Sequence, residues 1–330
     1  MSGKLKVGII SANWGVAADL PAWRANEGVG VVGICTAHQR KAEAAAEAND
    51  NPMAFWGYRT MAAHPDIDIV DAGTRPNLRY DMCMKALNAG KHVYNGVPFA
   101  DTMGHARDLY TAYKASGRVA AIDAYSEHMP PIAFAKELVA GGAIGDLYSL
   151  TCTIQMSLFN HQTSTFPYNW FWDRNNGCSA LRNLGSHALN VLYYLFGEIE
   201  DVVAQDETCL KEWKFVDNGS TITPQVEDTA NVLLRFKNGG MGVMLPAWCA
   251  IAGRGFMIDA FGSKGRLLLE GGGMPANETR VHYARIGEFT PTEQQVPDRR
   301  RRYEENELRL PFLLPDRANL LEQVRVGDRL

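Results

Sequence analysis

The sequence predicts an α/β protein of two domains: a doubly wound parallel sheet, followed by an α+β domain with a large open, mostly antiparallel sheet. Strand-like and helix-like segments alternate through the first 125 residues. From about residue 146, strand-like runs follow one another with glycine turns and little helix. A length of 330 residues leaves room for two cores. We therefore expect domains at 1–125 and 126–330, with the C-terminal segment packing back on the first domain.

In the first domain, short apolar runs that are typical of buried parallel strands alternate with helix-like stretches. The expected strands are 5–10, 29–36, 67–74 and 91–95. The expected helices are 19–26, 40–49, 82–90 and 106–117. This alternation indicates βαβ units.

The second domain shows a different pattern. Its expected strands are 146–158, 230–236, 240–248, 255–262 and 265–270, with one helix at about 179–196. Residues 291–310 are charged and weakly patterned, which favours a solvated loop. The pattern predicts a helix against one face of an antiparallel sheet.

Composition excludes several classes of partner. A net charge of −4 gives no basic excess for nucleic acid, and no apolar stretch reaches the roughly 20 residues that span a bilayer. The six cysteines are scattered without a C-x-x-C pair, which favours reduced thiols and a cytoplasmic location over disulfides or a structural metal.

The turn after the first strand indicates dinucleotide binding of the Rossmann type, because a strand, a tight turn and a helix can hold a pyrophosphate on free N–H groups. The motif is degenerate: Ser11 and Asn13 stand where glycines are usual, so an ordinary βα turn remains the alternative. The candidate cofactor-binding residues here are Gly8, Ile10, Ser11, Asn13, Trp14 and Gly15.

The end of the second strand gives a slight preference for NADP over NAD. Thr36 replaces the acidic residue that usually receives the ribose, and His38, Arg40 and Lys41 follow it. A hydroxyl with nearby cations suits a 2′-phosphate. The alternative is that Arg40 and Lys41 only begin a solvated helix.

Several ordered motifs resemble the Gfo/Idh/MocA group of NAD(P)-dependent oxidoreductases, and the likeness runs through nearly the whole chain. The matching stretches are 74–77 (TRPN), 89–100 (AGKHVYNGVPFA), 135–150, 183–187 (NLGSH) and 261–270. The resemblance implies the fold and dinucleotide binding. It adds cofactor-binding candidates in two loops: Thr74, Arg75, Asn77, Asn95, Gly96 and Pro98.

The resemblance also implies a catalytic set from which this chain departs. Members typically use the lysine of E-K-P and the aspartate and histidine of D-x-G-x-H. Here the lysine position is Val97 and the aspartate position is Asn183, whereas His187 is retained. We expect His187 to be the acid/base because histidine titrates near neutrality, with Asn183 and Tyr125 assisting. A packing role for His187 or Tyr125 is the alternative.

An aromatic segment at 157–173 precedes the helix that carries His187. Aromatic walls with polar tips suit a sugar or a cyclic substrate, although core packing explains some of these residues equally well. The candidate substrate residues are His161, Phe166, Tyr168 and Trp172.

Two functions follow. The first is an oxidoreductase acting on a hydroxyl/carbonyl pair of a sugar-, polyol- or cyclic alcohol-like substrate. The second is a catalytically inactive NAD(P)-sensing regulator, favoured by Val97 and Asn183. The partners expected are a small-molecule substrate and further copies of the chain, as a dimer or a dimer of dimers, because an open sheet face needs covering.

Overall fold

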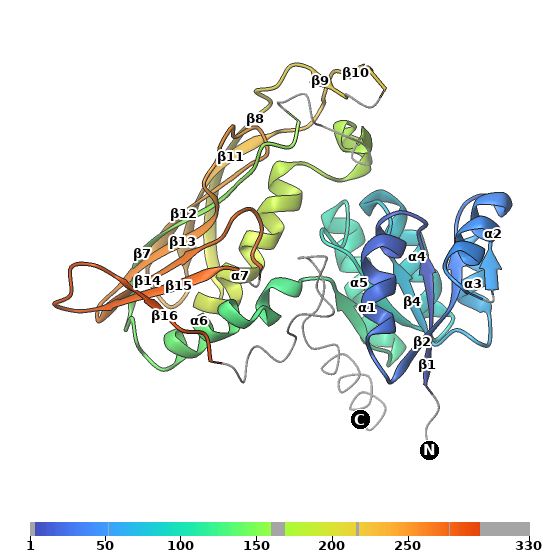
Figure 1. Cartoon of the computed structure of the whole chain (residues 1–330), viewed down its shortest axis with the longest axis horizontal. Coiled ribbons are helices and arrows are strands. Elements are labelled where there is room, and N and C mark those ends of the chain that lie inside the picture. Colours follow the sequence, from blue (N-terminus) through green and yellow to red (C-terminus); the bar gives the residue numbers. More distant parts are fainter. Residues whose placement is uncertain (1–3, 52, 160–168, 216–217, 277, 298–330) are drawn as a thin grey trace. The chain divides into compact units, whose positions relative to one another are not determined.

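The structure is a computed structural model that describes residues 4–51, 53–159, 169–215, 218–276 and 278–297. These residues form two compact units, each described here by itself. The first unit runs to Asp123 and also contains Asn175–Gly177. The second contains Ala124–Arg174 and the described residues from Cys178 to 297. Figure 1 colours the first unit mainly blue to cyan and the second mainly green to red.

The first unit is built on a six-stranded parallel sheet in the order β3-β2-β1-β4-β5-β6. Its strands are β1 (Leu5–Ile10), β2 (Val29–Cys35), β3 (Met53–Phe55), β4 (Ile69–Ala72), β5 (His92–Asn95) and β6 (Ala120–Ile122). Its helices are α1 (Leu20–Arg24), α2 (Gln39–Ala48), α3 (Tyr58–Ala63), α4 (Pro76–Asn88) and α5 (Met103–Ser116), with a π-helical turn η1 (Gly15–Asp19) before α1. This strand order is that of a Rossmann sheet, and the prediction is confirmed.

Both faces of the central strands are buried, as their unbroken apolar sequences predict. Every residue of β4 and β5 is buried. Successive residues of β1 enter opposite cores: Ile9 packs with Trp23 of α1, whereas Ile10 belongs to the cluster of Met61 and Leu109. Helices on both faces therefore fix the sheet, and only the strand ends remain for function.

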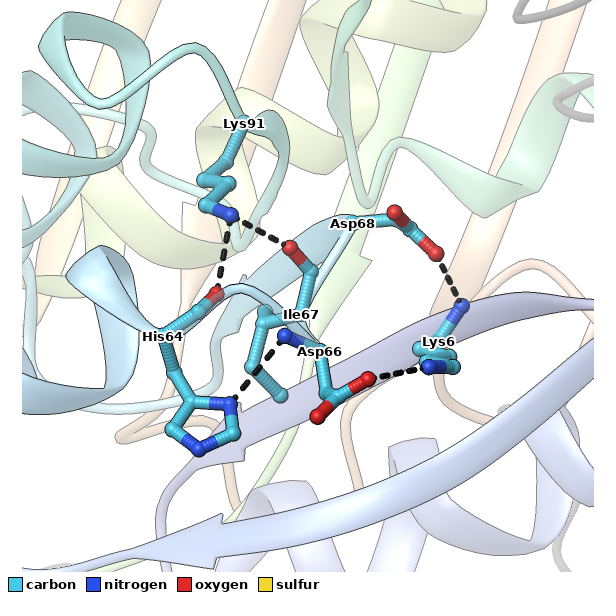
Figure 2. A network of polar contacts seen from close by, with 6 residues as sticks. All are labelled: Lys6, His64, Asp66, Ile67, Asp68 and Lys91. Atoms are coloured by element: carbon cyan, nitrogen blue, oxygen red, sulfur yellow. Dashed lines mark hydrogen bonds and ion pairs between the residues drawn. The ribbon is translucent and has the colours of Figure 1, made fainter.

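The amino ends of these strands are closed by the protein's own contacts (Figure 2). The Nζ of Lys91 donates to the backbone carbonyls of His64 (2.9 Å) and Ile67 (2.7 Å). The backbone N–H of Lys6 donates to the Asp68 carboxylate at 2.8 Å. Lys91, from the A-G-K-H-V stretch, thus has a structural role, and the carboxyl ends are the edge to search for a ligand.

The second unit carries an eight-stranded sheet in the order β16-β15-β14-β13-β7-β12-β11-β8. Its strands are β7 (Leu147–Gln155), β8 (Ile199–Glu207), β11 (Thr229–Phe236), β12 (Met241–Ala247), β13 (Gly255–Gly262), β14 (Gly265–Glu270), β15 (Arg280–Arg285) and β16 (Thr292–Gln294). Only the β7–β12 pair is parallel, so the predicted mostly antiparallel sheet is confirmed.

Helices cover one face of this sheet: α6 (Pro130–Ala140) and α7 (Ser186–Phe196) lie on the same side (Figure 1). The burial pattern of β11 agrees with a sheet that is covered on one face: Val232 and Leu234 are buried, whereas Leu233 and Arg235 are exposed. The remaining elements are short: β9 (Trp213–Lys214), β10 (Thr221–Ile222), and the turns η2 (Tyr125–His128), η3 (Asn169–Trp172), η4 (Arg174–Asn176) and η5 (Leu181–Gly185).

The helix expected at 179–196 is present, and its first part is the π-helical turn η5, which continues directly into α7. One local expectation is corrected. The loop expected at 291–310 begins with β16, which pairs with β15, so its first residues extend the sheet. Residues from 298 onward, including the C-terminal segment expected to pack on the first domain, lie outside the described residues.

Among the described residues, no helix combines the length and apolar character needed to cross a membrane.

Candidate functional site

In the first unit, the turn after β1 is shaped by a serine rather than by a glycine. The Ser11 Oγ accepts hydrogen bonds from the N–H groups of Asn13 (3.1 Å) and Gly15 (3.3 Å). Within the described chain, no hydrogen bond uses the N–H of Ala12 or Trp14. The degenerate motif therefore keeps a tight turn and leaves backbone donors for an anion.

Close backbone approach makes this turn part of a cradle. A Cβ on Gly15 would lie 2.7 Å from Ile9 Cγ2. A Cβ on Gly73, directly after β4, would lie 2.9 Å from the Gly15 Cα and 2.9 Å from Asp19 Oδ2. Only glycine at both positions lets the β1 turn and the β4 loop meet, which is the arrangement that a pyrophosphate needs. Sequence reasoning missed Gly73, although it stands between a strand and the T-R-P-N loop.

Two of the predicted cofactor residues face the protein interior. A Cβ on Gly8 would lie 2.7 Å from the Met61 Sδ, so this glycine makes room for α3. Ile10 is buried in the core with Met61. Both residues shape the strand that carries the turn.

The loop after β2 holds the residues expected near the adenosine ribose. The Thr36 Oγ1 donates to the His38 carbonyl (2.8 Å) and accepts from the His38 N–H (3.3 Å). The hydroxyl therefore shapes its own loop. His38 and Arg40 are exposed at the start of α2, and no acidic side chain lies between Thr36 and Lys41.

Arg79 of α4 links the two loops that the resemblance points to. Its Nε donates to the Thr74 carbonyl (2.5 Å) and its Nη1 to the Pro98 carbonyl (2.7 Å). A Cβ on Gly96 would lie 2.8 Å from this guanidinium. The buried Arg79 thus fills the space beside position 96, where E-K-P would place a glutamate. Arg79 therefore holds the loop in which Gly96 and Val97 depart from E-K-P. Sequence reasoning missed Arg79 because nothing in its spacing shows that it spans two loops.

Two side-chain amides at the carboxyl edge of the first sheet have oxygen atoms that accept no hydrogen bond from the described residues. Asn95 donates from Nδ2 to the Phe99 carbonyl (2.8 Å), and Asn77 donates to the Asn176 Oδ1 (3.2 Å). The Oδ1 atoms of Asn95 and Asn77 are buried and have no hydrogen-bond partner among the described residues. Buried acceptors without donors are costly, so this edge fits a ligand that brings N–H or O–H groups, as nicotinamide riboside does.

Asn176 was not expected here, since it lies far along the chain. Asn175–Gly177 belongs to the first unit, and Gly177 has a φ of +75°. A Cβ on Gly177 would lie 2.5 Å from the Asp101 Cβ, so the segment runs directly against the loop after β5. Of the other predicted residues, Arg75 and Trp14 are exposed.

In the second unit, the structure brings together His187 of α7 and Tyr125 of η2. Their ring centroids lie 5.5 Å apart. The Asn190 Nδ2 donates to the Ala124 carbonyl at 3.4 Å, which ties α7 to the residue before Tyr125. Two of the three predicted catalytic residues are therefore neighbours.

The electrostatics of His187 differ from the expectation of titration near neutrality. Its Nδ1 is buried and has no hydrogen-bond partner among the described residues. Burial lowers the pKa of His187 to about 4. The imidazole is therefore neutral at neutral pH, the form that accepts a proton.

Asn183 lies in η5, one turn before His187. Its backbone N–H donates to the Ser179 carbonyl at 2.8 Å, and no hydrogen bond in the described chain uses its half-buried side-chain amide. A π-helical turn beside a candidate site is a recurrent functional feature.

The aromatic segment is described only in part. His161, Phe166 and Tyr168 lie outside the described residues. Trp172 ends η3, and its carbonyl accepts from the Gln225 N–H (2.8 Å). Phe159 is buried and stacks on Trp213 with ring centroids 3.9 Å apart. Part of the segment therefore packs the interior.

Family models match residues in both units of the chain. A model described as "Oxidoreductase family, NAD-binding Rossmann fold" matches residues 5–124, and the "GFO/IDH/MocA C-terminal domain" matches residues 132–268.

Individual relatives include an uncharacterized oxidoreductase of Synechocystis sp., 26% identical over 269 residues, with 81% of this chain and 72% of the relative covered. Levoglucosan dehydrogenase of Pseudarthrobacter phenanthrenivorans is 28% identical over 218 residues, with 61% and 55% covered. The galactose/lactose metabolism regulatory protein of Saccharomyces cerevisiae is 22% identical over 240 residues, with 67% and 54% covered. The chain thus spans little more than half the length of the last two.

Among solved structures, a levoglucosan dehydrogenase in complex with NADH and levoglucosan has a TM-score of 0.78 at 22% identity, covering 88% of this chain and 79% of that one. The likeness shows the same fold. With both matched domains in their expected order, the chain belongs to the Gfo/Idh/MocA family of NAD-binding oxidoreductases.

Proposed function

We propose that the protein is an NAD(P)-dependent oxidoreductase that oxidises an alcohol group of a sugar-, polyol- or cyclic alcohol-like substrate. The observation that carries the proposal is His187, a neutral imidazole beside Tyr125. The bound nicotinamide supplies the hydride acceptor. His187 accepts the hydroxyl proton, Asn183 orients the substrate oxygen, and Tyr125 holds the imidazole and assists at the same oxygen.

Alcohol oxidation needs a base, and the imidazole of His187 is already in its basic form at neutral pH. The burial that lowers its pKa also weakens it as a base, so the pKa sets the protonation state of the free protein and not the direction of the reaction. The name of the levoglucosan dehydrogenase relative supports a sugar-like substrate. We propose that Trp172 contributes to its binding, together with His161, Phe166 and Tyr168.

The experiment is a turnover assay with NAD⁺ and NADP⁺ against anhydrosugars, inositols, aldoses and cyclic diols, followed by the absorbance of the reduced nicotinamide. Growth of that absorbance with at least one substrate class is expected. If both dinucleotides bind and no class is turned over, the second candidate replaces the first.

That second candidate is an NAD(P)-sensing regulator. Specific observations favour it: Val97 carries no charge, and Arg79 fills the space beside Gly96 in the same loop. The regulatory relative from yeast is a family member named for regulation.

We propose a slight preference for NADP over NAD, supported by the loop after β2. Replacing Thr36 with Asp should weaken NADPH binding by about tenfold or more, because the carboxylate repels the 2′-phosphate, and should leave NADH binding unchanged or tighter. Thr36→Ser, which keeps the hydroxyl bonded to His38, is the matched control. Equal NADPH dissociation constants for the wild type and Thr36→Asp would remove this proposal.

We also propose that a second copy covers the open sheet face. Leu233 of β11 lies directly opposite Val203 of β8, and these side chains are exposed by 58% and 65%, with Met241 exposed by 57%. Apolar residues gathered at one place on a sheet are typical of an interface. Light scattering should give a dimer or tetramer for the wild type and a smaller species for Leu233→Glu; a wild-type monomer would contradict this.

A further inference from the structure

Two cysteines and an aspartate meet at one end of the second sheet, remote in sequence from one another and unused by the proposed reaction. Cys209 follows β8, Asp228 precedes β11 and Cys249 follows β12. Their Sγ and carboxylate oxygen atoms all lie within 4.8 Å of one another. They are the one group of its kind found in the described part of the chain.

Strand register explains this meeting. Thr229, the first residue of β11, lies opposite Glu207 of β8 on one side and Ala247 of β12 on the other. Asp228 therefore sits between the chain leaving β8 and the chain leaving β12, which run beside β11 (Figure 1). The convergence is fixed by backbone hydrogen bonding rather than by a flexible loop.

Asp228 is held rigidly. It is fully buried, its Oδ1 accepts from the Cys209 N–H (3.0 Å), and its Oδ2 accepts from the Leu210 N–H (2.7 Å). No lysine, arginine or histidine within the described ranges forms an ion pair with it. The thiols of Cys209 and Cys249 also hydrogen-bond to this carboxylate. Its hydrogen-bonding capacity is therefore satisfied, and a cation bound here would meet a fixed, buried negative charge.

The two thiols add soft ligands on either side of this charge. The Sγ atoms of Cys209 and Cys249 both lie within 4.8 Å of the Asp228 carboxylate oxygen and of each other. Zinc binds sulfur at about 2.3 Å and carboxylate oxygen at about 2.0–2.2 Å in a tetrahedral arrangement, so two ligand atoms of one ion lie about 3.6–3.8 Å apart. Small side-chain rotations bring the three atoms into that range.

We propose that Cys209, Asp228 and Cys249 bind a thiophilic divalent cation of the zinc class. Two S–H bonds break and two metal–sulfur bonds form, the two protons pass to solvent, and no electron is transferred. The charge of the group stays at −1, since two thiolates and one carboxylate balance the ion. Cys209 is exposed, so the fourth position is open to water on that side.

The ion stabilises the base of the aromatic segment. Ser157 forms a bridge with Cys249, and the Leu158 N–H donates to the carbonyl of the adjacent Trp248 at 2.9 Å. A metal bond to Cys249 therefore ties this strand end to the loop after β8. The site is independent of the proposed redox chemistry.

The test uses the full chain without a polyhistidine tag, reduced with a phosphine, stripped with a chelator and desalted. Zn²⁺ is titrated against a chromophoric chelator, and Co²⁺ is added separately to record thiolate-to-metal charge-transfer bands. One ion per chain and a thiolate band are expected. Cys209→Ser and Cys249→Ser should each weaken Zn²⁺ binding by on the order of 100-fold or more. Cys83→Ala, which removes a buried thiol in the first unit, should bind as the wild type does.

Absence of the thiolate band, or equal affinity of Cys209→Ser and the wild type, would overturn the proposal. So would a chain that binds no Zn²⁺ but whose two thiols form a disulfide on peroxide treatment, because the pair would then be a redox couple. If Cys249→Ser fails to fold, Zn²⁺ binding by Cys209→Ser alone tests the proposal. The Cys209 side chain is exposed, so its replacement should not disturb folding.

Discussion

Replacing His187 with Gln lowers kcat/KM for alcohol oxidation by about 10²–10⁴-fold, the contribution expected of a positioned general base. Glutamine nearly fills the space of the imidazole but cannot accept the hydroxyl proton. NADH binding changes by less than about twofold, because the cradle described in the first unit does not contain His187. The measurement is steady-state kinetics on the best substrate of the panel, with cofactor affinity measured separately.

The matched control is His128→Gln, which removes the histidine at the end of η2. His128 is partly exposed and pairs with Glu127 at 3.5 Å, so its loss should leave kcat/KM near the wild-type value. A His187→Gln enzyme with unchanged kcat/KM would remove the role given to His187.

The same variant tests the electrostatics without any substrate. His187 titrates near 6.5 in an unfolded chain but near 4 in the folded protein. As the pH falls from 6.5 to 4, His187 becomes protonated in the unfolded chain but stays neutral in the folded protein. The free energy of unfolding therefore decreases. The shift corresponds to about 3 kcal/mol, lost between those pH values and absent in His187→Gln. Denaturant titrations at several pH values measure it; parallel curves for the two proteins would show that His187 is not desolvated.

Replacing Arg79 with Met should destabilise the first unit by about 2–4 kcal/mol and weaken dinucleotide binding by about tenfold or more. The carbonyls of Thr74 and Pro98 lose the donor that holds them, and both belong to loops at the carboxyl edge. Displacement of these loops moves Asn77 and Asn95, whose free acceptors fit the ligand. Chemical unfolding and NADH titration together measure the two effects.

Arg79→Lys separates loop positioning from stability. Lysine keeps the charge and one hydrogen bond, so an intermediate loss in both measurements is expected. Arg107→Met on the exposed side of α5 controls for the removal of an arginine. If Arg79→Met folds and binds NADH as tightly as the wild type, Arg79 does not position the cofactor loops.

Local sequence was sufficient for most of the fold. The strands β1, β4 and β5 each lie in a short run bounded by turn residues, so they could be placed from composition and spacing alone. The three-residue strands β3 and β6 were missed. The alternation in β11 likewise showed that one face of the second sheet is buried. The edge strands β8 and β16 could not be found, because each pairs with one neighbour and buries little.

The candidate site was predictable only where it follows a local motif. Ser11, Gly15 and His187 stand at motif positions, whereas Arg79 and Asn176 act through contacts made across the fold. The pKa of His187 also depends on burial by distant residues, which no local pattern reports. For the same reason, the meeting of Cys209 and Cys249 follows from strand register rather than from spacing.

The central claim is that the carboxyl edge of the first sheet binds a nicotinamide dinucleotide despite its degenerate glycine turn. The most direct measurement is calorimetric titration of the wild type and of Gly73→Val with NADH and NADPH. One dinucleotide should bind per wild-type chain, and Gly73→Val should bind more weakly, because its side chain would meet the Gly15 backbone. A wild-type chain that binds neither NADH nor NADPH would contradict the account.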